Sequence, residues 1–226
     1  LTATQIGDMS ATMLAAFTSM QLRGLTTTQI ADLSADQAGA LSGAQIGGFT
    51  TAQINALTST AIGGLDATRV AALSQAQIAA LKASTLAGLA ETQVAALTAT
   101  QIDALTTTQL AALAATQAAM LDATQIASLS TPQLQALSSS AIGALSTTQL
   151  GELGTTRLAA LTATQLQGMS GEQLAGLTTT AFAALTATGL GGLSTTAVAD
   201  LSTSRIAALT TTQLRGLAAP QVAGVS

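Results

Sequence analysis

Acidic side chains at one recurring place are the first candidates for metal chemistry in this chain. The sequence repeats every eight residues, and four of its ten acidic residues, Asp8, Asp32, Glu152 and Asp200, fall at the last place of the repeat. Hard cations such as Ca²⁺ need about six oxygen ligands in one place, whereas these carboxylates are at least three repeats apart. We therefore expect solvated surface charges and predict no metal site.

The composition offers little for acid–base or nucleophilic catalysis. The 226 residues include no His, no Cys and a single Lys. A Ser or Thr nucleophile needs an adjacent base, and a pair of catalytic carboxylates must converge in a cleft. We predict that the protein is not an enzyme, and that it has no catalytic residues, no cofactor-binding residues and no cofactor.

Threonines at the third and fourth places of the repeat could bind ice or a glycan. They include Thr107, Thr108, Thr147, Thr148, Thr155, Thr156, Thr211 and Thr212. Ice binding requires flat, even ranks, but the same two places also hold Asp36, Gly43, Glu91 and Glu172. We expect an outer surface of soluble, uncharged residues, and a Thr-face binding module is the alternative function.

Serine, threonine and glutamine also occur at a spacing whose chemistry is helix capping. In the octad 97–104, LTATQIDA, we label the positions a to h, so that Leu97 is a, Thr98 is b, Gln101 is e and Ile102 is f. Thr98 as N-cap and Gln101 as third helical residue form a capping box, and Leu97 with Ile102 forms a hydrophobic staple. Each octad therefore predicts the start of a new helix.

Other folds fit the eight-residue period poorly. A continuous helix would rotate the apolar stripe by about 80° per repeat, and a coiled coil needs a period of seven or eleven residues. Positions a and f would lie on opposite faces of a strand, so a β-solenoid is a minority alternative. Pro132 and Pro220 both fall at position d, in the first turn of a short helix, where proline is tolerated.

Glycine marks the other end of the predicted helix. Of the 20 glycines, 16 lie at position g or h. Glycine is favoured where a helix ends in a left-handed or tight backbone. We therefore expect such a conformation at the end of each octad.

The register runs unbroken through 28 octads, with two residues left over, and position a extends from Leu1 to Val225. No polar residue occurs at position a or f of any octad, so we predict that these two positions form the core and that c, d and e face outward. Such a core disfavours a disordered linker. Residues 1–226 are expected to be a single continuous array, with two, three or four octads per superhelical coil.

Two of the octads that depart from the consensus carry specific expectations. In octad 81–88, Lys82 stands at b and Thr85 at e, so both halves of the capping box are lost and we expect a less well-defined helix start. Asp66 at b and Arg69 at e are expected to form a salt bridge three residues apart.

Charge and hydropathy limit the partners. The net charge of −4 comes from ten acids and six bases scattered singly, so we expect no nucleic-acid partner. No apolar run approaches the roughly 18 residues of a membrane span, so no membrane insertion is expected. The pattern starts at Leu1 and stops at Val225 without polar capping repeats, so either the caps lie outside this chain or identical chains meet end to end. Low charge and ridges of Ala and Gly also favour self-association into a homo-oligomer or fibre.

The octad LTxxQIxA, seen at 97–104, 105–112 and 161–168, resembles the short tandem-repeat regions of very large bacterial cell-surface and adhesin-like proteins. The resemblance implies secretion, an extracellular rod, stalk or filament role, and attachment to the cell surface through regions outside this chain. We therefore predict an all-α solenoid or superhelical rod of very short capped helices, one per octad, that acts as a structural protein.

Overall fold

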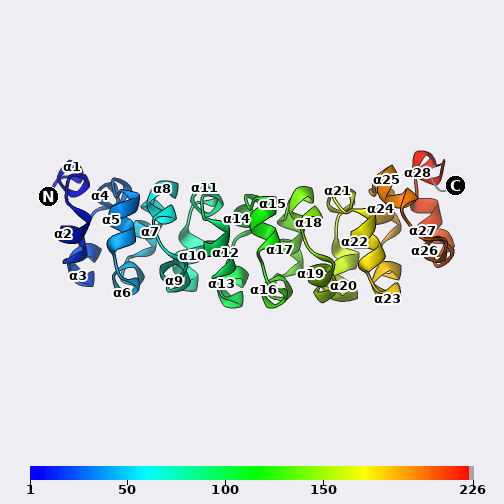
Figure 1. Ribbon diagram of the computed structural model, residues 1–226, viewed down its shortest axis with the longest axis horizontal. Helices are drawn as coiled ribbons and strands as arrows, with labels where there is room; N and C mark the ends of the chain where they lie inside the picture. The colour runs from blue at the N-terminus through cyan, green and yellow to red at the C-terminus, as the bar shows by residue number, and fades with distance from the viewer. Residues whose placement is uncertain (224–226) are drawn as a thin grey trace. The chain divides into compact units, whose positions relative to one another are not determined.

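The computed structural model describes residues 1–223, and this part of the chain is all-α (Figure 1). It holds 28 helices of five to seven residues, one for each octad, and no strand within those residues. The predicted fold class, a solenoid of very short helices, is confirmed. Val225, predicted to be a core residue, lies outside the described residues.

The helices fall into two compact units, Leu1–Ala112 and Leu113–Ser226, whose boundary lies between two octads. The first unit contains α1 (Ala3–Gly7), α2 (Ala11–Ala15), α3 (Ser19–Arg23), α4 (Thr27–Ala31), α5 (Ala35–Ala40), α6 (Gly43–Gly47), α7 (Thr51–Ala56), α8 (Ser59–Gly63), α9 (Ala67–Ala71), α10 (Gln75–Ala80), α11 (Ala83–Ala87), α12 (Glu91–Ala95), α13 (Ala99–Asp103) and α14 (Thr107–Ala111). The second contains α15 (Ala115–Ala119), α16 (Ala123–Ser128), α17 (Thr131–Ala136), α18 (Ser139–Gly143), α19 (Thr147–Glu152), α20 (Gly154–Ala160), α21 (Ala163–Gln167), α22 (Gly171–Gly176), α23 (Thr179–Ala183), α24 (Ala187–Gly191), α25 (Thr195–Ala199), α26 (Thr203–Ala207), α27 (Thr211–Gly216) and α28 (Ala219–Ala223). The single continuous array over residues 1–226 stays a prediction.

The helices begin where the capping boxes predict. At α14, the extended N-cap Thr106 accepts a hydrogen bond from the backbone N–H of Gln109 at 3.2 Å, and the Gln109 side-chain oxygen accepts from the Thr106 N–H at 2.8 Å. Pro132 lies in the first turn of α17, where it displaces no intrahelical bond. The capping box therefore marks the helix start in the octads that carry it.

The helix ends differ from the expectation for glycine. Position h keeps a right-handed backbone, with φ −76° at Gly24 and −75° at Gly64, and the only glycine with positive φ in the described residues is Gly154 at φ 67°. Gly154 stands at position b in place of an N-cap, and α20 there extends to seven residues. Of the two expected conformations, the left-handed one is not found at position h and the tight one is, since the N–H groups of Gly24 and Gly64 bond to carbonyls three residues earlier. Several of the glycines at h also lie against the backbone of another helix, as Gly64 does.

Within each unit a helix packs against the helices three before and three after it, as α5 does with α2 and α8. Three octads therefore complete one coil, and the helices align in three columns (Figure 1). This arrangement settles the number of octads per coil, which the period alone left open.

Positions a and f fill the interior of each unit. Ile102 and Leu110 at f are fully buried, and Leu97 and Leu105 at a are 3% exposed. The most exposed residues at these positions are Leu1, Leu214 and Val222, which lie in the first or last coil of the chain. Met9, Phe17, Leu25, Ile206 and Leu217 are half-buried, and the core prediction for a and f is confirmed in the coils between.

The prediction that position e faces outward is wrong. Fifteen of the 18 glutamines at this position are buried, Gln109 among them at 2% exposed. A buried amide needs hydrogen-bond partners, and the coil before it provides them.

Candidate functional site

The most specific polar arrangement in the molecule is a joint between successive coils, built around the buried glutamine at position e. The side-chain oxygen of Gln109 accepts from the Thr106 N–H at 2.8 Å and from the Thr106 hydroxyl at 3.0 Å. Its Nε2 donates to the carbonyls of Ile78 and Leu81, both at 2.8 Å. One amide thus caps its own helix and binds the corner between α10 and α11. We call this arrangement the glutamine joint.

The same joint recurs at a fixed sequence distance. Gln37, Gln53 and Gln173 each donate to the carbonyls 31, 30 and 28 residues earlier. Those carbonyls belong to positions f, g and a around a corner, where the end of a helix leaves them without intrahelical partners. Among the described residues, no buried side-chain nitrogen or oxygen lacks a partner. The joint therefore supplies hydrogen-bond donors to the carbonyl groups that the ends of short helices leave without intrahelical partners.

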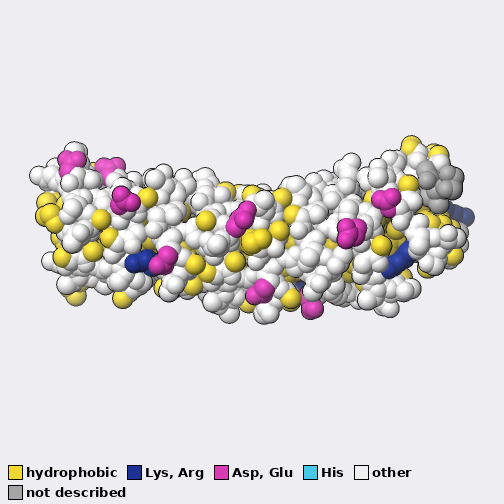
Figure 2. Space-filling model, viewed as in Figure 1, with side chains coloured by type: hydrophobic (Ala, Val, Ile, Leu, Met, Phe, Trp, Pro, Cys, Tyr) yellow, Lys and Arg dark blue, Asp and Glu magenta, His cyan; other side chains and the backbone are white. Residues whose placement is uncertain are grey.

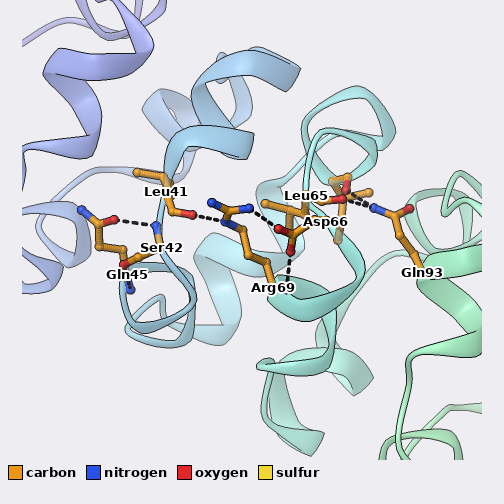
Figure 3. Close-up of polar contacts among 8 residues, drawn as sticks. Leu41, Ser42, Gln45, Leu65, Asp66, Arg69 and Gln93 are labelled. Atoms are coloured by element: carbon orange, nitrogen blue, oxygen red, sulfur yellow. Dashed lines mark hydrogen bonds and ion pairs between the residues drawn. The ribbon is translucent and has the colours of Figure 1, made fainter.

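Arginine at position e makes a variant of the joint. In Figure 3, Gln45, Arg69 and Gln93 extend from α6, α9 and α12, which stack in one column. Arg69 Nε donates to the Leu41 carbonyl at 2.5 Å, and its guanidinium forms an ion pair with Asp66. The predicted Asp66–Arg69 salt bridge is present, and it orients the guanidinium toward the corner.

A second arginine, Arg205, reaches the carbonyls of Ala175 and Leu177. Its guanidinium also lies 5.0 Å from the centroid of the Phe182 ring, within the range of a cation–π contact. Arg69 and Arg205 therefore make the bond between coils that glutamine makes elsewhere.

The octad 81–88 retains a shortened joint. Lys82 makes no side-chain capping bond, but α11 still begins at Ala83. The Thr85 hydroxyl donates to the Leu57 carbonyl at 3.2 Å, 28 residues earlier. The expected loss of definition is limited to the missing cap bond, because packing on the coil before fixes the helix start.

The acidic candidates do not form a site. Asp8, Asp32, Glu152 and Asp200 are exposed. Over residues 1–223, no three acidic or other metal-ligating side chains gather closely enough to hold a metal ion. Figure 2 shows charged side chains scattered over the viewed face without an extended patch of one sign.

The threonine candidates are distributed over several columns. In the second unit they lie on α19, α20 and α27, which belong to three different columns of helices. Most are exposed, but Thr147 at position c is partly covered, and Gly176, at position h of α22, lies against it. The structure therefore does not assemble these threonines into one flat rank.

One open groove in the first unit has a polar lining. Its volume is about 480 Å³, and it is lined by Thr27, Thr28, Ala31, Ala52, Asn55, Ala56 and Lys82. Hydroxyl, amide and ammonium groups are thus available on one shallow surface of α4, α7 and the start of α11.

Sequence reasoning missed the joint because it treated glutamine only as part of the capping box. The usable signal was that glutamine fills position e in 18 octads, more often than capping of exposed helix starts requires.

No helix among the described residues has the length and hydropathy of a membrane span.

Comparison with known proteins finds a similarity to one repeat family over part of the chain. Residues 14–51 match the family described as the ALTTAQ repeat, a stretch that runs from α2 into α7. The six letters of that description correspond to positions h and a to e of the octad, as in GLTTTQ at 24–29. No curated protein matches this chain. The chain is a tandem-repeat protein that is similar to the ALTTAQ repeat over residues 14–51.

Proposed function

We propose that this chain is a structural part of an extracellular, cell-surface protein: a rod or stalk that also associates with copies of itself into filaments, with no catalytic activity. The observation that carries the proposal is the recurrence of the glutamine joint at a constant spacing of 28 to 31 residues. Buried polar groups that in an enzyme would line an active site are used here to connect one coil to the next.

The joint gives a physical reason for stiffness. Sliding or bending one coil over its neighbour would separate Gln109 from the carbonyls of Ile78 and Leu81 while all three remain buried. An unpaired buried donor or acceptor costs about 1–3 kcal/mol. Because most coils repeat this constraint, the free energy of the stack is approximately a sum over neighbouring coils, which suits a spacer whose length is set by the number of octads.

The octad resembles repeats of bacterial surface proteins. This resemblance supports the proposed secretion, display at the cell surface and attachment through other regions. The charges are scattered, which supports a role without a nucleic-acid partner. The proposed partners are copies of the chain and components of the cell surface. No cofactor belongs to the proposed role.

Small-angle X-ray scattering of the dilute chain tests the rod. A globular protein of this length has a radius of gyration of about 17 Å, and we expect a value well above it together with the distance distribution of an elongated particle. Circular dichroism on the same sample ensures that elongation reflects folded helices. A folded sample with a radius near the globular value would contradict the proposal.

A display experiment tests the stalk. The chain is placed between a membrane anchor and an epitope on a bacterial surface, with a Gly/Ser linker of equal length as control. We expect antibody access to the epitope past the surface polysaccharide to be higher for the repeat chain, because a flexible linker spans only about 5–6 Å × √n for n residues. Equal access for both would argue against a stalk.

A glycan-binding module is the second candidate, and the groove over α4 and α7 is the observation that favours it. Thr27, Thr28 and Asn55 offer the hydroxyl and amide groups that hydrogen-bond to sugars. Titration of surface polysaccharide fragments by nuclear magnetic resonance should shift the amide signals of these residues. The matched variant Thr107→Val/Thr108→Val should leave such shifts unchanged, whereas Thr27→Val/Thr28→Val should remove them.

A further inference from the structure

Two residue types that occur only once each in the chain line the same groove of the first unit. Lys82 is the only lysine and Asn55 the only asparagine of the 226 residues. Asn55 lies on α7 and Lys82 at the start of α11, yet both side chains line the groove of about 480 Å³ that was described above over α4 and α7. In a chain built from few residue types, this coincidence distinguishes the groove from the rest of the surface.

Both residues replace a side chain that the repeat usually carries. Position b, where Lys82 stands, holds Ser, Thr or Asp in 23 octads, and position g, where Asn55 stands, holds Ala or Gly in 22. Lys82 makes no side-chain capping bond, although loss of an N-cap lowers the stability of a helix. The octad thus lacks a local bond and has an ammonium group at the groove instead.

The groove carries a positive charge without a negative one to balance it. Lys82 forms no ion pair among residues 1–223, and no carboxylate belongs to the lining of this groove. Thr27, Thr28 and Asn55 are exposed and add hydroxyl and amide groups, which both donate and accept hydrogen bonds. This set of groups suits a ligand that combines hydroxyl groups with a negative charge.

A second groove extends the surface along the same column of helices. It has a volume of about 300 Å³, lies over α7 and α10, and shares Ala52 and Asn55 with the first groove. Helix α7 packs against both α4 and α10, so the two grooves form one continuous track with Asn55 where they meet. A track of this kind suits a chain of linked sugar units better than a single small ion.

A groove in the second unit provides an internal comparison. It has a volume of about 320 Å³, and its lining includes the hydroxyl groups of Ser146, Thr147 and Ser170 together with the carboxylate of Glu172. Hydroxyl groups are therefore common to both grooves, whereas the sign of the charge differs. An acidic ligand should be repelled by this second-unit groove.

We propose that the groove over α4 and α7 binds an acidic glycan, with the ammonium of Lys82 paired to a sugar carboxylate. Thr27, Thr28 and Asn55 bind the hydroxyl groups of the neighbouring sugar units. This inference rests on the glycan-binding candidate given above and names its ligand class. Because a charge-assisted hydrogen bond is roughly twice as strong as a neutral one, the lysine distinguishes a sugar acid from its uncharged counterpart.

Titration with a galacturonic acid trimer and with its methyl ester measures the contribution of the charge, because the ester keeps the ring hydroxyls and lacks the carboxylates. Nuclear magnetic resonance should show shifts of the Thr28, Asn55 and Lys82 amide signals with the acid, and no shift at Glu172. We expect the acid to bind at least about threefold more tightly than the ester. This difference should shrink at high salt, since an exposed ion pair is screened.

Variants of Lys82 separate recognition from helix capping. Lys82→Thr restores the usual cap, so its urea midpoint should rise while the preference for acid over ester disappears. Lys82→Arg keeps the charge and should keep the preference. The matched control Arg23→Gln removes a positive charge from an exposed position of α3 and should leave both affinities unchanged.

The amide of Asn55 makes a separate contribution. Asn55→Ala restores a residue that is common at position g and favours a helix, so the variant should remain folded, which circular dichroism checks. Its affinities for the acid and the ester should fall together, because the sugar hydroxyls that the amide binds are present in both.

The outcomes separate this inference from the functions on which it builds. Equal affinities for the acid and the ester, or an undiminished preference in Lys82→Thr, would overturn the acidic ligand and leave the glycan-binding candidate standing. If neither trimer shifted any signal of the groove, the acidic ligand would be overturned as well, and the surface polysaccharide titration would then test the glycan candidate separately. The rod is independent of these results, because scattering from the dilute chain tests it.

Discussion

The glutamine at position e performs two tasks that other folds divide between residues. Its oxygen completes a helix cap, and its nitrogen binds the previous coil, as Gln165 does with the Thr162 N–H and the carbonyls of Leu134 and Leu137. The amide is the neutral side chain of this length that carries both an acceptor and a donor. Helix initiation and tertiary packing are therefore coupled through single residues.

Gln109→Ala should lower the free energy of unfolding by about 2–4 kcal/mol, because the buried carbonyls of Ile78 and Leu81 and the Thr106 N–H all lose a partner. Urea unfolding followed by circular dichroism measures the loss, and hydrogen exchange locates it. Gln75→Ala, at an exposed position c, should change stability by less than about 0.5 kcal/mol. Equal midpoints for the two variants would show that the joint contributes nothing.

Gln109→Glu should make stability depend on pH. Burial against the carbonyls of Ile78 and Leu81 should raise the pKa of the new carboxyl in the folded chain above its unfolded value of about 4.3. A raised folded pKa means that the variant is most stable below the unfolded pKa and loses stability as pH rises through the folded one. Urea midpoints between pH 4 and 8 should fall for Gln109→Glu relative to the natural sequence, and parallel profiles would contradict the joint.

Columns of helices are held together by close approach of backbones. Position h of one octad lies against position c of the helix three before it in the chain, as Gly64 does against Ala35 and Gly168 against Ser139. A Cβ on Gly64 would lie 2.1 Å from the Ala35 carbonyl oxygen. Packing between helices therefore requires glycine where two backbones approach as closely as they do at Gly64 and Gly168.

Adjacent glycines at the end of α8 provide a matched test. Gly64→Ala should destabilise the chain by about 1–3 kcal/mol, because the added methyl would overlap backbone atoms. Gly63→Ala should stabilise it by about 0.5–1 kcal/mol, since no atom lies within 4 Å of the added Cβ and alanine favours a helix. Thermal and urea unfolding should give shifts of opposite sign, and shifts of the same sign would contradict this packing of α8 against α5.

Each unit taken as a whole is modular, because most octads use the same positions for the same contacts. If one octad is removed and the eight-residue register is kept, the octad that follows it should therefore take its place in the stack. The similarity of residues 14–51 to the ALTTAQ repeat covers only part of the first unit, but the same joints occur in the second unit as well.

Deletion of a full octad and of half an octad should have different consequences. Removing residues 97–104 leaves every position a in register, so helix content per residue should stay constant and the chain should lose one joint between coils. Removing residues 97–100 takes away Thr98 and shifts positions a and f by half an octad. Although the second deletion is shorter, its urea midpoint should be lower, and the reverse order would contradict the modular stack.

The helix starts and the apolar core could be predicted from the residues alone. Thr98 and Gln101 bond to each other within a single octad, so the capping box is readable without knowledge of the fold. Leu97 and Ile102 of the same octad are buried, as their apolar character predicts. The same local reasoning placed Pro132 correctly and identified the Asp66–Arg69 pair.

Three other features required the folded chain: three octads make a coil, glutamine at e is buried, and glycine at h remains right-handed. Each depends on contacts between successive coils, such as Gln109 with Leu81 or Gly64 with Ala35. A period of eight residues is compatible with several coil sizes, because capping fixes where a helix begins but not the angle to the next. The packing between backbones of helices that are three apart in the chain fixes that angle. It thereby also fixes which carbonyl groups the side-chain nitrogen of each glutamine can reach.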